Sequence, residues 1–98
     1  MKNYVDESRE IINSTRAFLT EQFNTCSDIK IQFNGEHIDL FQHYDSEKVT
    51  DAKKMNKIIG CILELEGFEE AYEDLSCKDR IKKLKDLSKK IHNQFQEV

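Results

Sequence analysis

The chain has 98 residues, of which 35% are charged and 38% hydrophobic, with a formal net charge of −4. This length predicts one domain with one small core, and the six Phe residues argue against a disordered chain. No apolar run approaches the roughly 18 residues of a membrane helix, and the charged first twenty residues lack the apolar segment of a signal peptide. We therefore expect a cytoplasmic protein.

The first predicted element is an amphipathic helix over residues 3–25. Its apolar residues recur at spacings of three and four, as on one face of a helix. Asn3 is a candidate N-cap, and Asp6 and Glu7 suit the positive end of the helix dipole. Polar residues between the apolar ones, Arg16 among them, are expected on a solvated face.

The second predicted element is a β-hairpin over residues 28–42. Asn34-Gly35 lies between two runs that alternate apolar and polar residues, which is typical of a two-residue turn. This turn pairs residues whose numbers sum to 69, so one face of the hairpin is almost wholly apolar. Two strands alone are marginally stable in water, so we expect this face to pack on helices. The apolar face consists of Ile29, Ile31, Phe33, Ile38 and Leu40.

The rest of the chain predicts further helices. A central helix is expected over 46–66, capped by Asp45 or Ser46, with the apolar run 58–65 buried on most sides. Gly60 permits close approach of another helix, and Gly67 is a candidate C-cap where we expect the helix to break rather than bend. A short helix over 68–75 and a last helix over 77–96 follow. The predicted fold is therefore a small single α+β domain, 1–98, in the order α-β-β-α-α, with a two-stranded antiparallel hairpin packed on a layer of three helices.

Motifs for chemistry are weak. Three cysteines, Cys26, Cys61 and Cys77, have no CxxC spacing, which favours reduced thiols over disulfides or a zinc site, with Cys61 as a small core residue. The three histidines form no HxxxH pattern, and the three glycines form no phosphate-binding loop. We expect no metal, no cofactor and no enzymatic activity.

An acidic aromatic segment, residues 64–74, is the leading candidate surface. Aromatic anchors ringed by one sign of charge suit a basic protein partner, or imitate nucleic-acid phosphates. The alternative is that Phe68 and Tyr72 face the core and the acids only add solubilising charge. The candidate partner-binding residues are Glu66, Phe68, Glu69, Glu70, Tyr72, Glu73 and Asp74.

A basic segment over residues 78–90 is the alternative, as a nucleic-acid-binding face. Its charges straddle the apolar seam, it holds one arginine, and no aromatic residue is interleaved for stacking. We favour an ordinary solvated helix surface, whose positive field the neighbouring acidic segment partly cancels, over nucleic-acid binding. The candidate nucleic-acid-binding residues are Lys78, Arg80, Lys82, Lys83, Lys85, Lys89 and Lys90.

These observations lead to a ranked set of functions. The first is a small non-enzymatic protein-binding module, an inhibitor or immunity-type factor of the kind that phages or mobile elements encode. It would act on a cytoplasmic protein, one that could itself bind nucleic acid, in the host cytoplasm if a phage encodes it. The alternative is a nucleic-acid-binding regulator that uses the basic C-terminal helix. A homodimer through the open hairpin edge is compatible with both.

Overall fold

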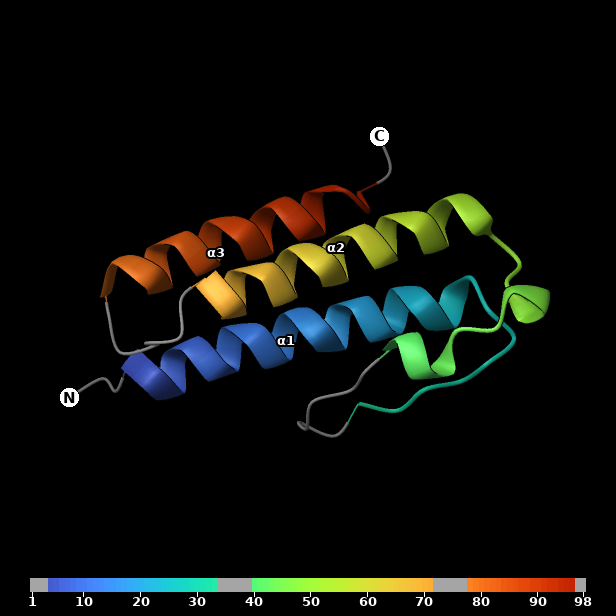
Figure 1. Cartoon of the computed structure of the whole chain (residues 1–98), viewed down its shortest axis with the longest axis horizontal. Helices are drawn as coiled ribbons and strands as arrows, with labels where there is room; N and C mark the ends of the chain where they lie inside the picture. Colours follow the sequence, from blue (N-terminus) through green and yellow to red (C-terminus); the bar gives the residue numbers. More distant parts are fainter. Residues whose placement is uncertain (1–3, 34–39, 72–77, 97–98) are drawn as a thin grey trace.

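The computed structural model describes residues 4–33, 40–71 and 78–96, which form three helices packed side by side (Figure 1). They are α1 (Tyr4–Thr25), α2 (Ala52–Ala71) and α3 (Lys78–Asn93). Two 3₁₀ turns, η1 (Leu40–His43) and η2 (Ser46–Lys48), lie between α1 and α2. The molecule measures 46 × 29 × 21 Å, so it is an elongated helical slab.

The predicted α+β fold is wrong, because the described residues contain no strand. Residues 29–33 have no regular secondary structure, and Leu40–His43 is a 3₁₀ turn rather than a second strand. The one β pairing among described residues is an isolated bridge between Ser27 and Val49. The Asn34-Gly35 turn, with the rest of 34–39, lies outside the described residues.

A side chain replaces the second strand. The Asn24 amide group donates to the Ile31 carbonyl at 2.6 Å, and the Ile31 N–H donates to Asn24 Oδ1 at 2.8 Å. The backbone of Ile31 therefore has both partners without a ladder. The alternating apolar residues still become buried, because Ile31 and Leu40 join the core around Leu19, Phe23 and Ile58.

The central helix begins later than the predicted residue 46. Asp51 caps it, since the Lys54 N–H donates to Asp51 Oδ1 at 3.0 Å. The earlier candidate cap, Asp45, accepts from the Glu47 N–H at 3.0 Å and caps the separate turn η2 instead. Two Asp caps six residues apart thus divide the predicted helix into a 3₁₀ turn and α2.

The predicted helix break at Gly67 is absent, because α2 continues through Gly67 to Ala71. Residues 68–71 of the predicted short helix belong to α2, and 72–75 lie outside the described residues. Neither Gly60 nor Gly67 has a positive φ or any neighbouring atom within 4 Å of an added Cβ. Gly60 is exposed, so the expected close approach to another helix of this chain does not occur.

We expect Gly67→Ala to raise the free energy of unfolding by about 1 kcal/mol, because Ala is the better helix former at an exposed position. Urea unfolding followed by circular dichroism measures this change. If Gly67 were a C-cap with a positive φ, the same substitution would destabilise the protein, and that result would contradict the continuous helix.

The core lies between the three helices. One cluster gathers Phe23, Met55, Ile58 and Cys61, and Ile91 of α3 joins it. A second, smaller cluster lies toward the other end of the bundle. It consists of Ile12, Leu65 and Leu84, one residue from each helix. Along the apolar side of α3, Ile81, Leu84 and Ile91 are buried and Leu87 is partly buried, and Phe95, just after the end of α3, is also partly buried.

Candidate protein-binding surface

Much of the acidic aromatic segment is engaged within the molecule or lies outside the described residues. Phe68 is partly buried and packs against the small core cluster, and Glu69 pairs with Arg16. Glu66 is partly buried on α2. Glu70 lies in α2 with its side chain undescribed, and Tyr72, Glu73 and Asp74 are outside the described ranges. The structure therefore brings no exposed aromatic cluster together here among the described residues.

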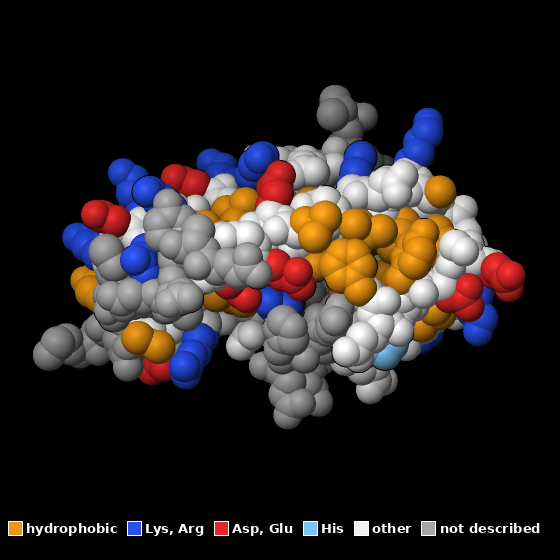
Figure 2. Space-filling view, in the orientation of Figure 1, with side chains coloured by type: hydrophobic (Ala, Val, Ile, Leu, Met, Phe, Trp, Pro, Cys, Tyr) orange, Lys and Arg blue, Asp and Glu red, His pale blue; other side chains and the backbone are white. Residues whose placement is uncertain are grey.

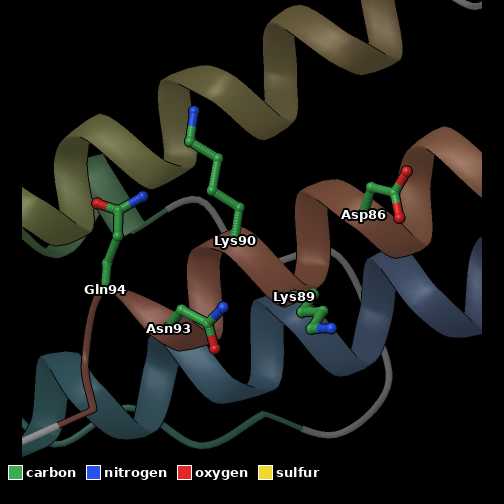
Figure 3. Close-up of a pocket in the computed structure, with 5 residues that line it drawn as sticks. All are labelled: Asp86, Lys89, Lys90, Asn93 and Gln94. Atoms are coloured by element: carbon green, nitrogen blue, oxygen red, sulfur yellow. The ribbon is translucent and has the colours of Figure 1, made fainter.

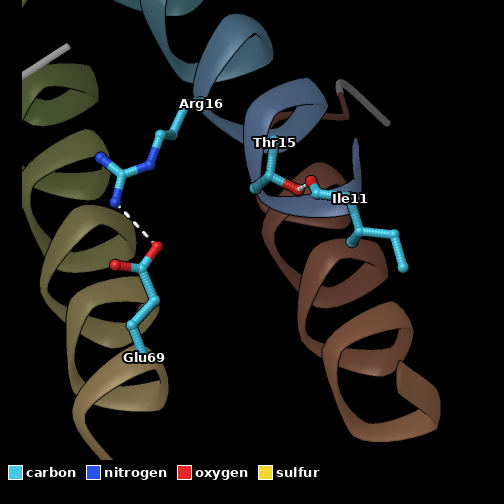
Figure 4. A network of polar contacts seen from close by, with 4 residues as sticks. All are labelled: Ile11, Thr15, Arg16 and Glu69. Carbon is cyan, nitrogen blue, oxygen red and sulfur yellow. Dashed lines mark hydrogen bonds and ion pairs between the residues drawn. The ribbon is translucent and has the colours of Figure 1, made fainter. Parts of the chain in front are cut away.

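The Arg16–Glu69 pair joins α1 to α2 (Figure 4). Arg16 Nη2 lies 2.8 Å from Glu69 Oε1, and the Arg16 side chain is only 7% exposed. Arg16 was expected on a solvated face, but its charge lies in the helix interface and needs a partner there. Its partner is 53 residues away, which no local pattern reveals.

Polar contacts also join α1 to α3. The hydroxyls of Thr15 and Ser88 are 2.8 Å apart, and Thr15 donates to the Ile11 carbonyl at 2.7 Å (Figure 4). Thr15 is fully buried, so these bonds satisfy a group that water cannot reach. Small residues at this contact, with Ser8 also buried, allow the two helices to lie close together.

The basic segment is better organised than its sequence indicated. Lys78, Lys82, Lys85 and Lys89 are all exposed and recur at spacings of four, three and four, so they share one face of α3. Lys83 and Lys90 lie on the other flank, and Arg80 is partly buried. Lys85 pairs with Glu7 at 3.0 Å, and Lys90 with Glu64 at 3.5 Å.

A shallow depression of about 390 Å³ lies on the outer surface of α3 and the turn that follows it (Figure 3). Lys90 reaches from it toward α2, while Lys89 leaves the other side of the helix. Asp86 at its edge lowers the positive charge of the depression. One helix and its following turn supply the whole lining, so the depression does not enclose a ligand. It is lined by Asp86, Lys89, Lys90, Asn93 and Gln94.

The prominent exposed apolar surface is one that the sequence analysis missed. Leu63 is 56% exposed and Phe41 is 39% exposed. Figure 2 shows hydrophobic side chains gathered between η1 and α2. Leu40 and Ile62, their chain neighbours, line one small cavity, which places η1 beside this part of α2. We name Phe41, Leu63 and the partly buried Ile59 the α2 apolar face.

A signal for this face was present in the sequence. The run 58–65 was expected to be buried on most sides. Leu63, however, lies five residues after Ile58, about 140° around a helix, and so points away from a core centred on Ile58. A helix with apolar residues on both sides has either two neighbours or one exposed apolar face.

The described thiols are buried and unreactive at neutral pH. Burial, and secondarily the nearby Glu64 carboxylate, raises the pKa of Cys61 to about 11. Burial likewise raises the pKa of Cys26, whose Sγ donates to the Phe23 carbonyl at 3.3 Å. Cys77 is outside the described residues. Within those residues, no group of three or more His, Cys, Asp or Glu side chains is placed to hold a metal ion.

The raised pKa of Cys61 predicts a loss of stability at alkaline pH. The unfolded thiol ionises near its ordinary value of 9.0 and the folded one near 11, so the contribution is full below pH 9 and is lost as pH rises toward 11. This difference between the two pKa values can lower the free energy of unfolding by at most about 2.7 kcal/mol. Urea unfolding at pH 8 and pH 11 will show a smaller loss for Cys61→Ala than for the wild type, and equal losses would contradict the assignment.

Comparisons with known proteins suggest no function, so a proposal has to be argued from the surface of the chain. No protein-family model matches the chain, and no match was found among curated proteins or solved structures. None of the helices in the described ranges is long and apolar enough to cross a membrane.

Proposed function

We propose that this chain is a non-enzymatic protein-binding module whose contact surface is the α2 apolar face. The observation that carries this proposal is the 56% exposure of Leu63, which shares one side of α2 with Ile59, while Phe41 of η1 is 39% exposed. Burying an exposed Leu side chain contributes about 1.5–3 kcal/mol to the stability of a complex, so a partner protein that covers this face would be bound more tightly. Lys57, Glu64 and Glu66 would form the polar rim that protein interfaces commonly have.

The class of function is the one that the sequence predicted, but the surface is different. Phe68 packs on the core and Glu69 forms an ion pair with Arg16, so both residues stabilise the fold. An inhibitor or immunity-type role in the cytoplasm stays a prediction from size and composition.

The proposal is tested with tagged protein recovered from a lysate of the source cells after nuclease treatment. We expect a stoichiometric polypeptide to be recovered with the wild type and lost with Leu63→Lys. Tyr4→Lys is the matched control, because Tyr4 is an exposed hydrophobic residue on α1. Recovery that is equal for wild type and Leu63→Lys would contradict the proposal.

Nucleic-acid binding by α3 is the second candidate, and the four-lysine face favours it. Lys78 and Lys89 are eleven residues apart, or about 16 Å along the helix, which would span several phosphates. Lys82→Gln, Lys85→Gln and Lys89→Gln together should lower affinity for a 20-base-pair duplex and reduce its salt slope by about 2–3. The control is the same change at Lys53, Lys54 and Lys57. An equal loss in both variants would contradict a specific face.

A further inference from the structure

The charge of α2 reverses along its length. Its N-terminal half holds three lysines and no acid, and its C-terminal half holds four glutamates and no base. This order opposes the helix dipole, which favours acids at the N-terminus and bases at the C-terminus. The lysines are Lys53, Lys54 and Lys57, and the glutamates are Glu64, Glu66, Glu69 and Glu70.

The fold compensates this pattern only in part. Glu69 pairs with Arg16, Glu64 lies 3.5 Å from Lys90, and Lys54 bonds to the Thr25 hydroxyl. Among the described residues, Lys57 has no ion-pair partner, and it is exposed. The N-terminal half of the helix therefore carries positive charge that other groups can still reach.

The outward side of α2 combines this charge with apolar surface. Asn56, Gly60, Leu63 and Gly67 are all exposed and recur at spacings of four, three and four, opposite the buried side. Ile59 lies at one edge of this strip, and Lys57 and Glu64 lie at the other. Gly60 has no atom within 4 Å of an added Cβ, so a second helix can approach the backbone there.

We propose that a second copy of this chain covers the α2 apolar face, with the two α2 helices antiparallel about a two-fold axis near Gly60. This inference rests on the proposed function, since it names the partner of the same face. In such a pair, corresponding edges of the two helices meet. Lys57 then faces Glu64 of the second copy, because the two residues are equally far from the axis, and Ile59 faces its Leu63. Each contact occurs twice, as two-fold symmetry requires.

Charge complementarity selects a second copy of the chain as the occupant. A helix that is basic in one half and acidic in the other is complementary to itself only when the copies run in opposite directions, and their dipoles are then opposed as well.

The register is tested by sedimentation of charge variants. The wild type should sediment at twice 11.6 kDa at high concentration. Lys57→Glu and Glu64→Lys should each raise the dissociation constant at least tenfold, because each places like charges at both 57–64 contacts. An equimolar mixture of the two variants should recover a heterodimer, since every such contact then joins an acid to a base.

Three further measurements make the outcomes decisive. Lys82→Glu on α3 is the control for charge and should leave dimerisation unchanged, and circular dichroism shows that each variant is folded. Leu63→Glu should raise the dissociation constant more than a hundredfold, because the change occurs twice in the interface.

Three outcomes would overturn the inference: a wild type that is monomeric up to 500 µM, a dimer that Leu63→Glu does not weaken, or a mixture of the charge variants that associates no more tightly than each variant alone. If the wild type is monomeric but still captures a different protein through Leu63, the proposed function stands without this partner.

Discussion

Glu69→Ala is expected to lower the free energy of unfolding by about 3 kcal/mol. Arg16 is 7% exposed and would stay buried after losing the carboxylate 2.8 Å from its Nη2. Removing one partner of a buried ion pair costs about 3–5 kcal/mol, and the partial exposure of Glu69 places this pair at the lower end. Urea unfolding measures the loss.

The matched control is Glu64→Ala, which removes another glutamate of the same helix. Glu64 lies 3.5 Å from Lys90 in an exposed pair, which contributes less than about 1 kcal/mol. Similar losses for the two variants would show that Arg16 does not depend on Glu69. A large loss for Glu69→Ala alone also separates the structural role of Glu69 from a role in partner binding.

Asn24→Ala is expected to destabilise the protein by a similar amount, about 3 kcal/mol. It removes both partners of the Ile31 backbone, the 2.6 Å bond to the carbonyl and the 2.8 Å bond from the N–H. Each buried backbone group left without a partner costs about 1–3 kcal/mol. Asn24→Asp keeps the acceptor and loses the donor, so its loss should be intermediate. Urea unfolding again measures both variants.

Asn13→Ala is the control, because it changes the same residue type on the same helix, and the Asn13 side chain makes no hydrogen bond among the described residues. It should be close to neutral. A hairpin over 28–42 would supply partners for Ile31 from its second strand, and Asn24 would then be dispensable. A neutral Asn24→Ala would therefore support the hairpin against the observed fold.

Helical periodicity predicted helical segments at α1, α2 and α3, but it placed Arg16 on a solvated face and Leu63 in the core. Alternation misled over residues 28–42. Alternation of apolar and polar residues predicts that one face becomes buried, as Ile31 and Leu40 are. It does not predict which groups form hydrogen bonds with the backbone. The Asn24 amide supplies these bonds from seven residues upstream. A turn signal such as Asn34-Gly35 is local, so it does not show that the Asn24 side chain takes the hydrogen bonds of a second strand.

The candidate site was harder to predict because tertiary contacts decide it. Gly is common where a helix ends, so Gly67 predicted an end of α2. Phe68 packs on the core and Glu69 pairs with Arg16, and these contacts stabilise α2 beyond Gly67. Glu69 was assigned to a binding surface because it lies among acids around Phe68 and Tyr72, and its pairing with Arg16, 53 residues away, leaves no local pattern. Leu63 was assigned to the core because it lies in the most apolar run of the chain, although its angle from Ile58 places it outside.

The proposed function depends on the exposure of Leu63, which can be measured as the solvent accessibility of its methyl groups. We would add a soluble paramagnetic agent to methyl-labelled Lys57→Glu protein at a concentration well below its dissociation constant, so that dimerisation does not cover Leu63. We expect strong broadening of the Leu63 methyl signals and little broadening for Leu84, which is fully buried. Leu63 methyls as protected as those of Leu84 would place Leu63 in the core and contradict the proposed surface.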